Sequence, residues 1–143
     1  MGTGQMFLVL MAVVLFSTII LTTQNNLFTL AYSSYEAMIM MQGYKIADRF
    51  LQEIEAMNIS GSKSIEDIHD QYSFADSMLR INMIDYYVTS TTQWCDRSGG
   101  SPTDSLHNYL RIDVRIDGIL GNDTIFIGHD TNPISYIYGK MGM

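Results

Sequence analysis

The chain carries no charged side chain before Glu36. Within this charge-free stretch, residues 6–21 (MFLVLMAVVLFSTIIL) are apolar at every position except Ser17 and Thr18. A segment of this composition is not stable in water. As a helix it would be about 25 Å long, close to the roughly 30 Å hydrocarbon core of a bilayer. It therefore needs either lipid or copies of itself around it.

Cysteine and basic residues are also scarce. The single cysteine, Cys95, excludes an intrachain disulfide and leaves the redox compartment open. The chain has 8 Lys and Arg against 15 Asp and Glu, for a net charge of -7. Nucleic acids and anionic membrane surfaces are bound through clusters of basic residues, so this balance disfavours both as partners of the charged part of the chain.

The apolar N-terminus has three interpretations. A cleaved secretory signal is disfavoured because residues 1–5 contain no Lys or Arg and residues 21–24 are a poor cleavage site. A permanent single-span anchor fits the length, although the positive-inside rule has no basic side chain to act on before Lys45. The third interpretation is a subunit whose apolar helix is buried among identical helices.

The helical pattern continues beyond the apolar run. Residues 24–57 contain no proline, and Gly43 is their only glycine. We therefore expect one long helix over residues 1–57, with an assembly or membrane segment at about 5–23, ended by the polar residues and glycine of 58–61. The expected packing face of its second half comprises Tyr35, Ile39, Ile46, Phe50, Ile54 and Met57. The expected opposite face comprises Lys45, Asp48, Gln52 and Glu55.

Residues 58–143 read as a small antiparallel β-sheet head. A short helical turn capped by Ser64 is expected at 64–68, and strands at 84–92, 109–117, 124–127 and 134–138, with a flexible loop at 96–105. In the strand 109–117, the expected buried residues are Leu110, Ile112, Val114 and Ile116. The residues expected on its solvent face are Tyr109, Arg111, Asp113, Arg115 and Asp117. The predicted fold class is α+β, a long helix packed on this sheet.

This arrangement is similar to the type IV pilin family, which includes pseudopilins and archaeal pilins. The motif that carries the resemblance is Gly4-Gln5-Met6 followed by Phe7-Leu8-Val9-Leu10, at the start of the apolar helix. The resemblance implies a subunit that is inserted in the cytoplasmic membrane and then assembled by pilus-type machinery into an extracellular homopolymer at the cell surface. It makes Gly4 and Gln5 the candidate processing site and implies no cofactor.

Assembly also follows from the residues themselves. Once such a helix leaves lipid, its apolar surface must be buried by neighbours, and head-to-tail association that does not close gives a filament. The expected assembly residues are Phe7, Leu8, Leu10, Val13, Val14, Leu15, Phe16, Ile19, Ile20 and Leu21. The alternative is a minor pilin, pseudopilin or binding component of a secretion apparatus that stays anchored in the membrane by a single span.

An enzyme or metal site finds little support. His69, His107 and His129 lack metal-ligand spacing, and no activating motif surrounds Cys95. A calcium site among Asp113, Asp117, Asn122, Asp123 and Asp130 would not match a known loop. We therefore expect no catalytic residue, cofactor or metal.

Two sequons lie in predicted turns. They are Asn58-Ile59-Ser60 and Asn122-Asp123-Thr124, which makes Asn58 and Asn122 candidate glycosylation sites. Adhesion, motility, DNA uptake and surface spacing all remain open as roles of the filament.

Overall fold

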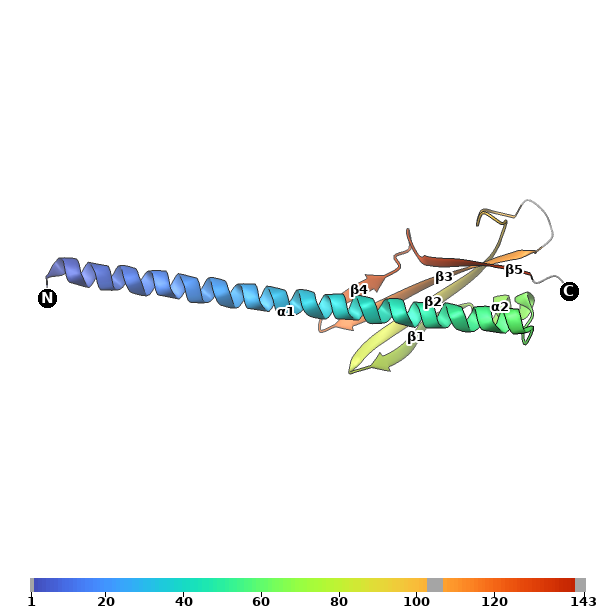
Figure 1. Ribbon diagram of the computed structural model, residues 1–143, viewed down its shortest axis with the longest axis horizontal. Coiled ribbons are helices and arrows are strands. Elements are labelled where there is room, and N and C mark those ends of the chain that lie inside the picture. Colours follow the sequence, from blue (N-terminus) through green and yellow to red (C-terminus); the bar gives the residue numbers. More distant parts are fainter. Residues whose placement is uncertain (1, 103–106, 141–143) are drawn as a thin grey trace. The chain divides into compact units, whose positions relative to one another are not determined.

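The computed structural model describes residues 2–102 and 107–140. It is an α+β fold in which a long N-terminal helix packs through its second half on an antiparallel sheet, as predicted (Figure 1). The chain divides into two compact units, Met1–Ala37 and Met38–Met143. The elements are α1 (Thr3–Ser60), α2 (Ile65–Gln71), β1 (Phe74–Ile81), β2 (Ile84–Cys95), β3 (Tyr109–Leu120), β4 (Asp123–Ile127) and β5 (Ile134–Gly139).

Helix α1 ends where the sequence supplies its stop signal, at Ser60. Gly61 follows with a φ of 66°, a left-handed conformation that favours glycine. Its N–H donates to the Asn58 carbonyl at 3.3 Å, and the Ser62 N–H donates to the Met57 carbonyl at 3.2 Å. These two bonds form a Schellman motif, which satisfies carbonyls that the end of the helix would otherwise leave unpaired.

Helix α2 confirms and extends the turn expected at 64–68. The Ser64 hydroxyl accepts a hydrogen bond from the Asp67 N–H, and the Asp67 carboxylate accepts one from the Ser64 N–H. This reciprocal capping box satisfies two N–H groups at the start of a short helix.

The four expected strands are present, each within three residues of its predicted ends. Strand β3 lies at the centre of the sheet and pairs antiparallel with β2 along one edge. Along its other edge β5 pairs with Tyr109–Val114 and β4 with Ile116–Leu120. The expected loop is confirmed over 96–102, and its last residues lie outside the described part of the chain.

Strand β1 was not predicted. It pairs only with β2, and all of its residues between the two ends are exposed, so it has no alternation of buried and exposed side chains. Its pairing with β2 shifts register between Phe74 and Ser77, next to Asp76, which has a φ of 52°. The hairpin closes through Asn82 and Met83, which both have positive φ, as a two-residue type I′ turn requires.

The packed face of α1 differs from the predicted one. Tyr35 is 56% exposed, and Ile46, Phe50, Met57 and Glu55 are all half-buried. Only two of the expected residues are fully in the core, and the buried residues of α1 are Ile39, Gly43, Ala47, Leu51 and Ile54. The prediction is wrong at Tyr35 and holds in part elsewhere, because Ile46 and Phe50 pack against the edge of the core. It missed Gly43 and Ala47 because it sought large apolar side chains, whereas these small residues allow a close approach of helix and sheet.

Glycine makes this close approach possible from both sides. A Cβ at Gly43 of α1 would overlap Cδ1 of Ile127 in β4. A Cβ at Gly118 of β3 would lie 2.5 Å from Cγ2 of Ile39 in α1. Tyrosines add hydrogen bonds across the same interface, because Tyr86 donates to the Gln42 side chain at 2.6 Å and Tyr138 to the Leu51 carbonyl at 2.8 Å.

The two faces of β3 are only partly as expected. Leu110, Ile112, Val114 and Ile116 are each 0% exposed, which confirms the buried face. The expected solvent face is wrong at Asp113, which is 8% exposed. The Asp113 carboxylate is covered by Arg111 of the same strand and by Ser135 of β5, which both donate hydrogen bonds to it.

Candidate assembly surface

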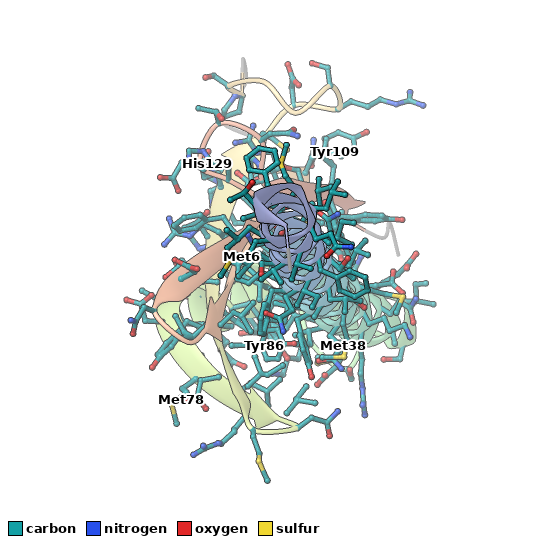
Figure 2. All side chains as sticks on the ribbon, turned by 90° about the vertical axis from the view of Figure 1, so that its left-hand side faces the viewer. Met6, Met38, Met78, Tyr86, Tyr109 and His129 are labelled. Atoms are coloured by element: carbon teal, nitrogen blue, oxygen red, sulfur yellow. The ribbon has the colours of Figure 1, made fainter. Side chains whose placement is uncertain are left out.

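The ten predicted assembly residues lie in the first part of α1 and are all exposed, by between 49% and 69%. Figure 2 looks along the helix from its N-terminal end, with Met6 close to the viewer. Because a helix turns by about 100° per residue, ten residues within Phe7–Leu21 cover every side of it. The apolar surface is therefore a complete sleeve and not a single stripe.

This part of α1 has the properties of a membrane span. The helix is long and apolar enough to cross a bilayer, and none of the most apolar window is buried within the structure. A helix in the core of a soluble protein would be mostly buried. Among residues 2–102 and 107–140, nothing covers the sleeve.

Four threonine hydroxyls in this part of α1 are bonded to the helix itself. The side chains of Thr18, Thr22 and Thr23 donate to the carbonyls three or four residues earlier, each at 2.8 Å. Thr29 donates to the Asn25 carbonyl at 2.9 Å. A hydroxyl bonded in this way tolerates an apolar environment, either lipid or a neighbouring helix.

The candidate processing residues Gly4 and Gln5 are exposed in the first turns of α1. The Gln5 N–H donates to the Gly2 carbonyl at 2.9 Å. A Cβ at Gly4 would meet nothing within 4 Å.

The two sequons differ in their surroundings. Asn122 is exposed in the turn between β3 and β4. Asn58 is half-buried near the end of α1, and its amide nitrogen donates to the Gly139 carbonyl at 3.2 Å. A glycan is attached through this amide nitrogen, so the geometry favours Asn122 as the acceptor.

His69, His107 and Cys95 take part in packing. The rings of His69 and His107 pack on Trp94, with centroid distances of 5.0 and 4.7 Å. Cys95 is 4% exposed, and burial raises the pKa of its thiol, which favours the less reactive protonated form. Within residues 2–102 and 107–140, no three His, Cys, Asp or Glu side chains gather as metal ligands.

The aspartates considered for calcium are largely paired with arginines. Asp113 accepts hydrogen bonds from Arg111 at 2.7 and 3.0 Å and from the Ser135 hydroxyl at 2.5 Å. Arg115 lies 2.6 Å from Asp130 and 3.5 Å from Asp117. The guanidinium groups of Arg111 and Arg115 therefore already neutralise the negative charge of these carboxylates.

These pairs line a polar groove that sequence reasoning missed. It has a volume of about 450 Å³, and its lining includes Thr89, Thr91, Gln93, Arg111, Asp113, Arg115, His129, Asp130, Thr131 and Ser135. Alternate polar residues of β2 and β3 were the available signal, because on paired strands such residues share one face.

No protein-family model, curated protein or solved structure matches this chain. Its function is therefore inferred from the residues themselves.

Proposed function

We propose that this chain is the structural subunit of an extracellular, type IV pilus-like filament, which polymerises through the apolar first part of α1. The observation that carries the proposal is the contrast between the uncovered sleeve and the second unit. Residues 38–140 contain a core of their own, whereas the sleeve residues remain 49–69% exposed. Identical helices supply a cover without any other component.

Burial of the sleeve is strongly favourable once the helix has left lipid. Ten large apolar side chains at about 2 kcal/mol each give an upper bound of roughly 20 kcal/mol per subunit for removing this surface from water. In lipid, helices gain little from meeting, so close packing decides their association. Outside lipid, the same side chains make a bundle of helices very stable.

The proposed route begins with insertion in the cytoplasmic membrane and ends with a homopolymer at the cell surface. The apolar segment at the start of α1, which is long enough to cross a bilayer, supports the first stage. Pilus-type assembly machinery would supply the extraction. The chain itself has no proposed catalytic role and needs no cofactor.

A second candidate function is a minor, membrane-anchored component of a secretion apparatus. The observation in its favour is the match between residues 6–21, about 25 Å as a helix, and the hydrocarbon core of a bilayer. In this case the sleeve would stay in lipid permanently.

Shearing of intact cells separates the two. Thin fibres in the sheared supernatant, seen by negative-stain microscopy and containing peptides of this chain, would support the filament. Retention of the chain as a low-abundance protein in detergent-soluble membranes, with no fibres, would support the anchored component and contradict the filament.

A further inference from the structure

The charge-free part of α1 is longer than a bilayer is thick. The helix begins at Thr3, and the first charged side chain is Glu36, so the charge-free helix is about 50 Å long at about 1.5 Å per residue. The hydrocarbon core is about 30 Å thick. A tilt of roughly 50° would be needed to fit the whole segment, beyond the observed range of about 0–40°. Lipid therefore covers only part of this surface.

Three consecutive amides indicate which part lipid covers. Gln24, Asn25 and Asn26 are exposed and point in directions about 100° apart. Each amide has two N–H donors and a carbonyl acceptor, and burial of these groups in hydrocarbon without partners is costly. The favoured position therefore places residues 3–23 in the hydrocarbon core and the amides at its boundary.

The apolar character of the helix resumes after the amides. Phe28 is 74% exposed, Tyr35 is 56% exposed and Tyr32 is 44% exposed. Tyr35 would lie about 18 Å beyond residue 23, farther than the roughly 5–7 Å depth of the headgroup layer. An aromatic belt at the membrane interface therefore does not account for this end of the segment.

These rings form one surface, which we call the aromatic stripe: Phe28, Ala31, Tyr32 and Tyr35. Their spacing of three and four residues puts them on one face of the helix. With Thr29 at the rim, they line a shallow hollow in which large rings flank the small side chain of Ala31. The stripe thus presents both a projection and a recess, as helix packing of ridges into grooves requires.

The surroundings of the stripe favour a second copy of this chain as its occupant. The chain has a net charge of -7, but no charged side chain lies between Thr3 and Tyr35. Identical copies meet here without like-charge repulsion, whereas a charged partner surface would be buried against a helix with no counter-charge. We propose that the aromatic stripe is a contact between copies of this chain that lies outside the bilayer. This inference rests on the proposed function, because it names the surface at which the subunits meet beyond the membrane.

Photo-crosslinking tests the contact directly. The full chain would be reconstituted in phosphatidylcholine vesicles with a photoreactive benzoylphenylalanine at position 28 or 35. The matched control carries it at position 30, because Leu30 is 67% exposed on the opposite side of the same helical segment. We expect adducts of twice the subunit mass from positions 28 and 35, at least tenfold above position 30, joined to peptides from residues 27–35.

Adducts to lipid alone, absence of adducts, or equal yields at position 30 would overturn the inference. Substitution gives a second readout. Phe28→Ala combined with Tyr35→Ala is expected to weaken self-association at least tenfold without changing resistance to carbonate extraction, whereas Leu30→Ala leaves both unchanged. Unchanged self-association in the double variant would also contradict the proposal.

The outcomes separate this inference from the filament itself. Fibres on cells together with no self-adducts at position 28 or 35 would refute the stripe and leave the filament standing. Self-adducts in a chain that never forms fibres would support the stripe and refute the filament.

Discussion

Both parts of α1 carry large apolar side chains, but those that pack on the sheet in the second unit are buried and those in the first unit are exposed. In the second unit, Ile39 and Ile54 of the helix are 0% exposed beneath the sheet. In the first unit, Phe7 and Phe16 are 62% and 69% exposed. The same kind of side chain is therefore buried in one part of the helix and exposed in the other. The difference is that a sheet packs on the second part.

Under the proposed function, folding and assembly would use separate surfaces. The second unit has a continuous core, so its stability does not require the sleeve to be covered. The sleeve residues are exposed within the described part of the chain, and under the proposed function they contribute only when copies or lipid surround them. A substitution in the sleeve should accordingly leave the stability of the second unit unchanged, and a substitution in the core should act on that stability first. The variants below test this separation.

The largest expected effect is loss of assembly in Val13→Asp. Val13 is 57% exposed, so the change leaves the second unit folded. A carboxylate at the centre of a membrane helix costs about 3 kcal/mol even by the lowest scales, and in a dry bundle it has no partner. Electron microscopy should show no fibres, whereas Val13→Leu should form them. Fibres of normal abundance from the aspartate variant would contradict the sleeve model.

The converse change is Ile112→Asp, which places a charge in the core. Ile112 is 0% exposed, and we expect a loss of more than about 4 kcal/mol, enough to unfold the second unit. Urea unfolding of the full chain in detergent micelles, followed by fluorescence of the single tryptophan, Trp94, measures this. The exposed Gln93→Asp on the neighbouring strand is the control. A cooperative transition in Ile112→Asp like that of the control would refute the core assignment.

Gly43→Ala tests the close approach of helix and sheet. The added Cβ overlaps Cδ1 of Ile127, a side chain only 1% exposed, so we expect a loss of about 1–2 kcal/mol. This loss opposes the gain in helix propensity of up to about 1 kcal/mol that alanine brings. Gly4→Ala, in the same helix but with open space around it, should not destabilise the chain. Equal stability of the two variants in the same urea assay would argue against tight packing at Gly43.

Asp113→Asn is expected to destabilise the second unit by about 1–3 kcal/mol, because it weakens charged hydrogen bonds in a mostly buried site. Sequence alone placed Asp113 on a solvent face, where this change would do little. The structure instead surrounds it with Arg111 and Ser135. Glu53→Gln, at an exposed position on α1, is the comparison. The denaturation midpoint decides between the two expectations.

The smallest effect is expected from Ser90→Ala. Ser90 is 0% exposed, and among the described residues its hydroxyl has no hydrogen-bond partner. Removing an unpaired buried hydroxyl should be neutral or stabilising by up to about 1 kcal/mol. Thr92→Val should instead lose about 1 kcal/mol, because the Thr92 hydroxyl donates to the His69 carbonyl at 3.0 Å. A clear loss of stability in Ser90→Ala would reveal a partner for this hydroxyl.

The features predicted from sequence are those visible in local composition or spacing. The absence of charge before Glu36 identified the sleeve, and the period-2 alternation from Tyr109 to Asp117 identified strand β3. Gly61 marked the end of α1 because its chemistry is local.

The features missed depend on pairing and packing and not on a local sequence pattern. Strand β1 is an exposed edge without alternation, so pairing with β2 alone defines it. Gly43 and Ala47 are buried because a sheet happens to lie close to them. The cover of Asp113 depends on Ser135, which is brought beside it by the pairing of β3 with β5. For the candidate surface, composition alone identifies the apolar residues. The aromatic stripe differs from the rest of this surface only through its position along α1 relative to the thickness of a bilayer.

The hydrogen bonds between α1 and the last strand have a mechanical consequence. Tyr138 and Gly139 of β5 are tied to Leu51 and Asn58 of the helix. A pulling force along α1 would act on both hydrogen bonds at the same time, and on the packed core beneath them. The head should therefore resist traction as one block, and rupture under force should be abrupt, without the gradual peeling of a terminal strand.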